Sequence, residues 1–143
     1  MHHIVYISTA SLPVTELDLE RFLRAWCHNN ARDGVTGILL YSEDEGRFMQ
    51  VIEGEKAAIL TLFAKIERDY LHRNLVKLAD GPIPRRNFTA WLMGFKVLTT
   101  AAFAQLAGYV DPTGPDFQVA LATTHDALIR HLLDTFTTET APG

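Results

Sequence analysis

Three polar side chains, two inside apolar runs and one at the end of an amphipathic segment, constrain the fold and use of this chain more than any other feature. Tyr6 lies in the run HIVYIS and Gln50 in the run RFMQVI, and both runs are typical of strands. Asn30 lies at the end of an amphipathic segment. A phenol or carboxamide that is buried without a partner costs roughly 1–3 kcal/mol, so these groups must bond to each other or to a polar ligand. None of them is a strong acid, base or nucleophile at neutral pH, so the trio favours holding a neutral heteroaromatic ligand over breaking a bond.

Hydrophobic periodicity predicts helices that alternate with strands along the chain. Apolar residues follow a helical spacing from Leu19 to Trp26, and Gly34 is a suitable terminator for a helix that runs to about Asn29. A second helix after Gly54 has an apolar face from Ile59 to Tyr70. Strands are predicted at residues 3–9, 35–41, 47–53, 75–79 and 88–98, with an acidic hairpin loop at 42–46 and turns at 81–84.

The resulting order, βαββαββ, predicts an α+β fold of the ferredoxin-like sandwich type. Five strands form a mixed sheet, and the two helices cover one of its faces. C-terminal helices are predicted at residues 101–107 and 125–136, on either side of a Pro- and Gly-containing linker at 111–115. This fold hosts many functions, so it does not identify one by itself.

Composition excludes several classes of protein. A length of 143 residues corresponds to one domain, and a net charge of −4 without a basic stripe argues against direct nucleic-acid binding. The single cysteine, Cys27, excludes an internal disulfide, and no Cys/His spacing indicates a metal site. No apolar run is long enough to span a membrane, so we expect a cytoplasmic protein without a membrane partner.

Five segments together carry a resemblance to a known family. They occur in order, at residues 4–8, 29–37, 46–54, 68–74 and 88–95, and read IVYIS, NNARDGVTG, GRFMQVIEG, RDYLHRN and FTAWLMGF. In this combination the chain resembles the BLUF family of flavin-binding blue-light sensors, specifically its short, stand-alone members. The resemblance implies a photosensor domain over residues 1–98 and a helical extension over residues 99–143.

The resemblance also implies roles for individual residues. Tyr6 matches the tyrosine that gives an electron and a proton to the photoexcited flavin, and Gln50 matches the glutamine between this tyrosine and the flavin. Asn30, with Asn29 beside it, matches the asparagine that holds the same edge of the ring. The residues expected to bind the cofactor, which is FAD with FMN as the alternative, are Tyr6, Asn29, Asn30, Gln50, Lys65 and Asp69.

Trp91 and Met93 match the residues of the fifth strand that relay the signal. The implied output runs through the C-terminal helices to an unidentified protein partner, within a homo-oligomer and without catalytic turnover.

The chemistry of the residues agrees with this role. A carboxamide such as that of Gln50 can exchange its donor and acceptor ends by rotation, which suits a switch in hydrogen bonding. The flavin supplies the photochemistry, and the protein supplies placement and hydrogen bonds.

Ordinary structural roles remain the alternative for each residue taken alone. Tyr6 is also compatible with a packed strand tyrosine, Gln50 with an edge or strand-end residue, and Asn30 with an ordinary helix C-terminal residue. Trp91 and Met93 are compatible with core positions. Lys65 and Asp69 are compatible with a solvated pair at i and i+4 of a helix. Two alternative functions follow. One is a light-insensitive ligand-binding or interaction domain. The other is an acylphosphatase-like hydrolase that uses Arg32 and Asn30, although the chain lacks a glycine-rich phosphate loop near an N-terminal arginine.

Overall fold

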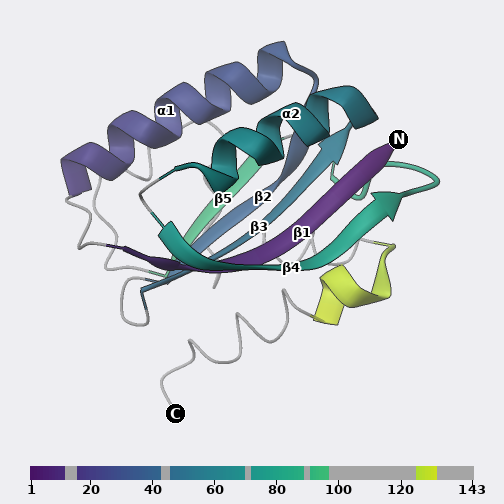
Figure 1. The fold of residues 1–143 in the computed structure, drawn as a ribbon. Coiled ribbons are helices and arrows are strands. Elements are labelled where there is room, and N and C mark those ends of the chain that lie inside the picture. The colour runs from purple at the N-terminus through teal and green to yellow at the C-terminus, as the bar shows by residue number, and fades with distance from the viewer. Residues whose placement is uncertain (12–15, 43–45, 70–71, 89–90, 97–124, 132–143) are drawn as a thin grey trace.

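Five strands and two helices form a two-layer α+β sandwich in the computed structural model (Figure 1). The structure describes residues 1–11, 16–42, 46–69, 72–88, 91–96 and 125–131. The elements are β1 (His2–Ala10), α1 (Glu16–Arg32), β2 (Thr36–Ser42), β3 (Arg47–Gly54), α2 (Lys56–Glu67), β4 (His72–Pro82) and β5 (Trp91–Lys96). The predicted order βαββαββ is therefore confirmed.

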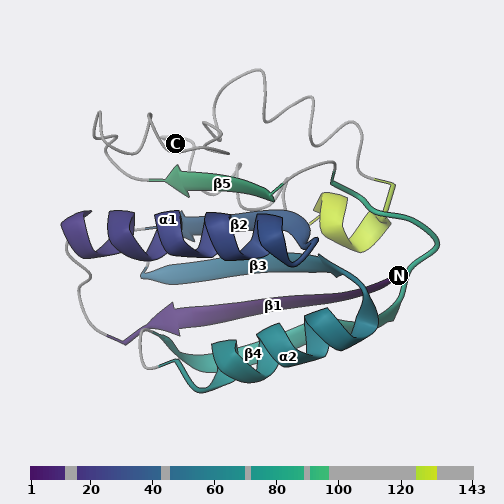
Figure 2. The ribbon, with the colours of Figure 1, turned by 90° about the horizontal axis from the view of Figure 1, so that it is seen from above.

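The strands are arranged in the order β4-β1-β3-β2-β5. Pairing is antiparallel between β1 and β3, between β1 and β4 and between β2 and β3, whereas β5 runs parallel to β2. Figure 2 shows α1 and α2 lying side by side over the same face of this mixed sheet. The predicted fold class, a five-stranded mixed sheet with both helices on one face, is confirmed.

Alternation along the strands gives the sheet two apolar faces. The inner face, which packs against α1 and α2, carries a buried cluster that includes Ile4, Leu39 and Ile52. The outer face carries a second cluster that includes Val5 and Val51. A short helix at residues 127–131 lies against this outer face, on the side of the sheet opposite α1 and α2 (Figure 1). Both faces of the sheet therefore have a helical segment packed against them.

Several predicted boundaries differ from the observed ones. Helix α2 ends at Glu67, and Tyr70, which the periodicity places on its apolar face, lies outside the described residues. Strand β4 is longer than predicted, and its last residues, Gly81 and Pro82, had been expected to form a turn. β4 tolerates this proline because a strand at the sheet edge leaves one row of its N–H groups unpaired. The fifth strand starts at Trp91 and not at Phe88.

Strand β4 is irregular where it pairs with β1. The register shifts twice, between Val5 and Tyr6 and between Ile7 and Thr9. Asn74 has a φ of 53°, a left-handed conformation that Asn tolerates better than most residues. Such irregularities increase the local twist of a strand.

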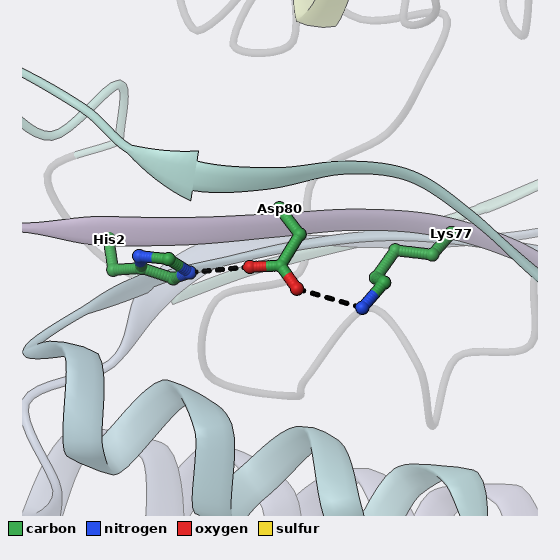
Figure 3. A network of polar contacts seen from close by, with 3 residues as sticks. All are labelled: His2, Lys77 and Asp80. Carbon is green, nitrogen blue, oxygen red and sulfur yellow. Dashed lines mark hydrogen bonds and ion pairs between the residues drawn. The ribbon is translucent and has the colours of Figure 1, made fainter.

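A polar network joins the first residue of β1 to β4 and α2. Figure 3 shows His2 and Lys77 reaching the two oxygens of the Asp80 carboxylate, at 2.6 Å and 2.8 Å. The Lys77 Nζ also lies 5.2 Å from the ring centroid of Phe63 in α2. The hydrogen bonds from Lys77 and then from His2 lower the pKa of Asp80. Because Lys77 and Asp80 are exposed, the contribution of their ion pair to stability is small.

Predictions for the tail lie mostly outside the described residues. This applies to the helix at 101–107, the linker at 111–115 and the portion of the last helix beyond residue 131. Inside the described segment, residues 127–131 are helical, within the predicted range 125–136. Among the residues that the structure describes, no helix combines the length and the apolar character needed to cross a membrane.

Candidate functional site

A cavity of about 200 Å³ lies between the inner face of the sheet and the two helices. Its walls come from β1, α1, β2, β3, α2 and the residues that follow each helix. The lining residues are Tyr6, Trp26, Asn29, Asn30, Arg32, Asp33, Leu39, Phe48, Gln50, Leu62, Lys65, Ile66 and Asp69. All six residues predicted to bind a cofactor are therefore brought together around one space.

Tyr6 and Gln50 form a hydrogen-bonded pair at the floor of the cavity. They are register partners on the adjacent strands β1 and β3, so their side chains leave the sheet on the same face. The Tyr6 hydroxyl donates to the Gln50 Oε1, and the two residues are only 3% and 6% exposed. The Tyr6 ring also makes an edge-on contact with Phe63, with ring centroids 5.8 Å apart.

Burial keeps the Tyr6 hydroxyl protonated. Desolvation raises the pKa of Tyr6 far above its ordinary value of 10.0, and the negative charge of Asp69 acts in the same direction. A neutral phenol can donate its proton in a hydrogen bond, whereas a phenolate cannot. The resting pair is therefore a neutral donor facing a neutral acceptor.

The end of α1 fixes the backbone of Asn30. The Val35 N–H donates to the Asn30 carbonyl at 2.8 Å, and the Gly34 N–H donates to the Ala31 carbonyl at 3.4 Å. With Gly34 at a φ of 70°, this is the Schellman arrangement that commonly ends helices. Asn30 is 4% exposed and lines the cavity, so the helix terminus holds a carboxamide against the ligand space.

Charged residues gather toward the C-terminal ends of the two helices. Lys65 in α2 and Asp69 just after it line the cavity, as do Arg32 and Asp33 at the end of α1. The Arg32 Nε donates to the Asp33 Oδ1 at 3.1 Å, and this hydrogen bond lowers the pKa of Asp33. Both of these residues are exposed, so these charged groups lie near solvent, whereas the buried lining residues of the cavity are all neutral.

The two residues predicted to relay a signal are placed only by their backbone. In the parallel pairing of β2 with β5, Met93 is the register partner of Leu39, which lines the cavity, and Trp91 is the partner of Gly37. Both therefore lie on the strand beside a cavity wall. Their role as a relay stays a prediction.

The apolar walls contain residues that sequence reasoning did not assign to the site. These are Trp26, Leu39, Phe48, Leu62 and Ile66. Trp26 and Leu62 belong to the predicted apolar helix faces, and Phe48 shares a strand face with Gln50. Periodicity identified them as core residues, but periodicity alone does not separate a core side chain from one that faces a cavity.

This donor set fits a flat heteroaromatic ring. Aliphatic and aromatic side chains can contact its two faces, and the amides of Asn30 and Gln50 supply donors and acceptors for a polar edge. A ring system with alternating carbonyl and N–H groups, such as that of a flavin, matches both features. Among the described residues, no group of three His, Cys, Asp or Glu side chains is placed to hold a metal ion.

Comparison with known proteins identifies the family. The BLUF family, "Sensors of blue-light using FAD", matches residues 1–94. The chain therefore belongs to the BLUF family of flavin-binding blue-light sensors. The recognition made from the five ordered segments is confirmed.

Curated relatives contain a similar region within much longer proteins. The photoactivated adenylate cyclase subunit beta of Euglena longa is 36% identical over 107 residues, which cover 74% of this chain and 12% of that protein. The corresponding subunit of Euglena gracilis is 32% identical over 107 residues, again 12% of its length. This chain thus spans about an eighth of the length of these relatives.

Solved structures include a protein of matching size. The dark-state structure of BlrB, a BLUF protein, aligns with a TM-score of 0.64 and 28% identity, covering 96% of each chain. A bacterial light-regulated adenylyl cyclase aligns with a TM-score of 0.63 and 26% identity, covering 97% of this chain and 34% of that one. The same fold therefore occurs alone and joined to an enzyme.

Proposed function

We propose that this chain is a blue-light photoreceptor that holds FAD non-covalently in the cavity between the sheet and the helices α1 and α2. The observation that carries the proposal is the buried hydrogen bond between Tyr6 and Gln50 at the floor of that cavity. None of the lining residues is a cysteine, which favours non-covalent binding. FMN is the alternative cofactor, because both flavins share the ring that the cavity suits.

In this proposal, Tyr6 and Gln50 are the photoactive residues. A flavin bound in the cavity would supply the absorption of blue light and, once excited, would accept an electron and a proton. Tyr6 is the donor, because its hydroxyl is neutral and buried beside the ligand space. Gln50 accepts the Tyr6 hydrogen bond, so rotation or tautomerisation of its amide changes what it presents to the ligand. The lit state then differs from the dark state in hydrogen bonding around one side chain.

Four further residues are proposed to position the ring. The carboxamide of Asn30, with Asn29 beside it, holds the polar edge of the ring from the end of α1. Lys65 and Asp69 contribute from the end of α2, where both line the cavity. A positive and a negative group at this end suit a ring edge that carries both acceptors and donors.

The output is proposed to be a change of protein contact without catalytic turnover. Trp91 and Met93 in β5 pass the change at Gln50 to the C-terminal helices and from there to a protein partner. A small change in hydrogen bonding can signal only if it biases an element with two arrangements. We further propose a cytoplasmic homo-oligomer. Partners in the form of effector domains are supported by the cyclases among the relatives.

An absorption spectrum before and during blue illumination tests the proposal. We expect a flavin spectrum that moves reversibly to longer wavelength in the light. The released cofactor, separated by chromatography, distinguishes FAD from FMN. A colourless protein that cannot be loaded with either flavin would support the light-insensitive ligand-binding domain instead.

A further inference from the structure

A buried carboxylate on the outer face of the sheet takes no part in the proposed photochemistry. Glu53, near the end of β3, is 0% exposed. Its Oε1 accepts hydrogen bonds from the Phe88 N–H at 2.7 Å and the Thr36 hydroxyl at 2.9 Å, and its Oε2 accepts from the Asn87 N–H at 2.9 Å. A buried charge is tolerated only when it is well hydrogen-bonded, and these donors come from two separate segments. Glu53 therefore fixes their positions relative to β3.

The Asn87 side chain extends this contact to the C-terminal helix. Its Nδ2 donates to the Glu53 Oε2 at 3.4 Å, while its Oδ1 accepts from the Asp126 N–H at 3.0 Å. The Asp126 Oδ1 in turn caps the helix at 127–131 by accepting from the Ile129 N–H at 3.1 Å. Asn87 is thus a two-ended connector between β3 and this helix.

Packing supports the same attachment. Ile129 is 0% exposed and belongs to the outer-face cluster, together with Phe88 and Val51. The guanidinium of Arg86 strengthens the loop, since its Nη1 donates to the Thr36 hydroxyl at 2.8 Å and to the Glu53 carbonyl at 3.1 Å. These contacts anchor the described part of the helix, residues 127–131, to β3 and to the loop at 86–88.

Strand β3 carries Gln50 and Glu53 on opposite faces of the sheet. Gln50 points to the cavity between the sheet and the helices, whereas Glu53 holds residues 86–88, which lead to β5, and through Asn87 the helix at 127–131. Both segments proposed to carry the output are therefore attached at one carboxylate, three residues from the proposed switch. A change at Gln50 on the inner face can therefore reach the helix on the outer face through β3 itself.

We propose that Glu53 is a positioning residue that holds residues 86–88 and, through Asn87, the helix at 127–131 against β3; we call this attachment the seating of the helix. We further propose that light weakens the Asn87–Asp126 contact. The light-dependent half of this proposal rests on the proposed photoreceptor function. The seating of the helix in the dark does not, so the two can fail separately.

Amide hydrogen exchange of the flavin-loaded protein tests the seating. The Ile129 and Arg130 N–H groups donate to the Asp126 side chain and carbonyl, so their protection reports whether the helix is seated. Asn87→Ala removes both ends of the connector. We expect their protection factors to fall about tenfold in the dark, with the flavin spectrum unchanged. Leu128→Ala, at an exposed position of the same helix, is the matched control and should leave protection unchanged.

Asn87→Asp gives a sharper readout, because it retains an acceptor for the Asp126 N–H. The new carboxyl group faces Glu53, and two buried carboxylates in contact cannot both remain ionised without a large cost. At low pH the new group is protonated and can donate to Glu53, so we expect protection at Ile129 close to that of the unmodified protein. At neutral pH protection should drop. A pH-independent protection factor in this variant would contradict the role of Glu53.

Illumination of the unmodified protein tests the light-dependent half. We expect the protection of the Ile129 and Arg130 amides to fall in blue light and to recover with the flavin spectrum. In Asn87→Ala, dark and lit protection should be equal, although the spectral shift persists. A normal spectral shift without any change of protection would overturn the light-dependent half. A protein without a spectral shift would instead refute the photoreceptor function, while the dark measurement still decides the seating.

Discussion

The hydrogen bond between Tyr6 and Gln50 is the residue-scale feature on which the proposed photochemistry depends. Tyr6→Phe removes the donor but retains the ring and its contact with Phe63. We expect the flavin to bind and its reversible red shift to be lost, because the electron and proton donor is gone. The buried Gln50 acceptor also loses its partner, which should lower stability by about 1–3 kcal/mol.

Absorption spectroscopy under blue light and urea unfolding measure the two effects. Tyr41→Phe is the matched control, since Tyr41 is equally buried but does not line the cavity. It should leave the red shift intact. An unchanged red shift in Tyr6→Phe would remove Tyr6 from the mechanism.

Gln50→Leu tests the other half of the pair. Leucine has a similar size but offers no acceptor to Tyr6 and no amide to rotate. We expect a variant that binds flavin with a dark spectrum that illumination no longer shifts, measured by difference spectroscopy. Met49→Leu changes the adjacent residue, which packs on the opposite face, and should keep the shift. A full shift in Gln50→Leu would mean that the switch lies elsewhere.

His3 provides a prediction about pH. It is 6% exposed on the outer face, and its Nδ1 has no hydrogen-bond partner within the described part of the chain. Burial lowers the pKa of His3 below its ordinary 6.5; His2 acts in the same direction, and Asp126, Glu53 and Asp80 act in the opposite one. The unfolded chain therefore takes up this proton more readily than the folded one.

The stability that comes from a neutral His3 is fully present above about pH 6.5 and is lost as the pH falls below it. One proton contributes a slope of at most about 1.4 kcal/mol per pH unit. Urea unfolding midpoints across this range measure it, and His3→Phe should flatten the dependence. Removal of the exposed His28 by His28→Gln should not. Equal slopes for the original protein and His3→Phe would assign the effect to other groups.

At the scale of elements, the C-terminal turn of α1 positions Asn30. Gly34 has a φ of 70°, and a Cβ built there meets no atom within 4 Å. Gly34→Ala therefore tests backbone strain alone, and we expect a loss of about 1–2 kcal/mol together with weaker flavin binding. Thermal unfolding and flavin titration are the measurements. Gly34→Asn should cost less, because Asn tolerates this conformation; an alanine variant as stable as the original protein would contradict the prediction.

The order of elements could be predicted because each has a clear period. The boundaries of β4 could not, since Gly81 and Pro82 are turn residues in most contexts and lie in a strand here only because β4 is an edge strand. The importance of Tyr6 and Gln50 could be predicted because a polar group in an apolar run requires a partner, whereas Asn30 was singled out by its place at the end of an amphipathic segment. The role of Glu53 could not be predicted, because a Glu near a strand end is expected to be exposed. It is buried here because the loop at 86–88, which is distant in sequence, packs over it.

At the scale of the whole molecule, the cavity links flavin binding to stability. The lining side chains come from β1, α1, β2, β3 and the end of α2, so global unfolding disperses the site. A ligand that binds only the folded state stabilises it by about 2.7 kcal/mol at 100 times its dissociation constant. We expect removal of the flavin to lower the thermal midpoint and added flavin to restore it. A midpoint independent of flavin concentration would contradict binding in this cavity.

Strand β4 has a consequence for how crowded copies of this protein behave. It forms one edge of the sheet and exposes Val76 and Leu78. The unpaired backbone groups of such an edge can pair with a strand of another molecule, and this pairing can start aggregation. Here two register shifts, the left-handed Asn74 and the terminal Pro82 distort the edge. The irregular edge is therefore a poor template for intermolecular sheet growth, and we expect β4 not to promote polymerisation when many copies are crowded together.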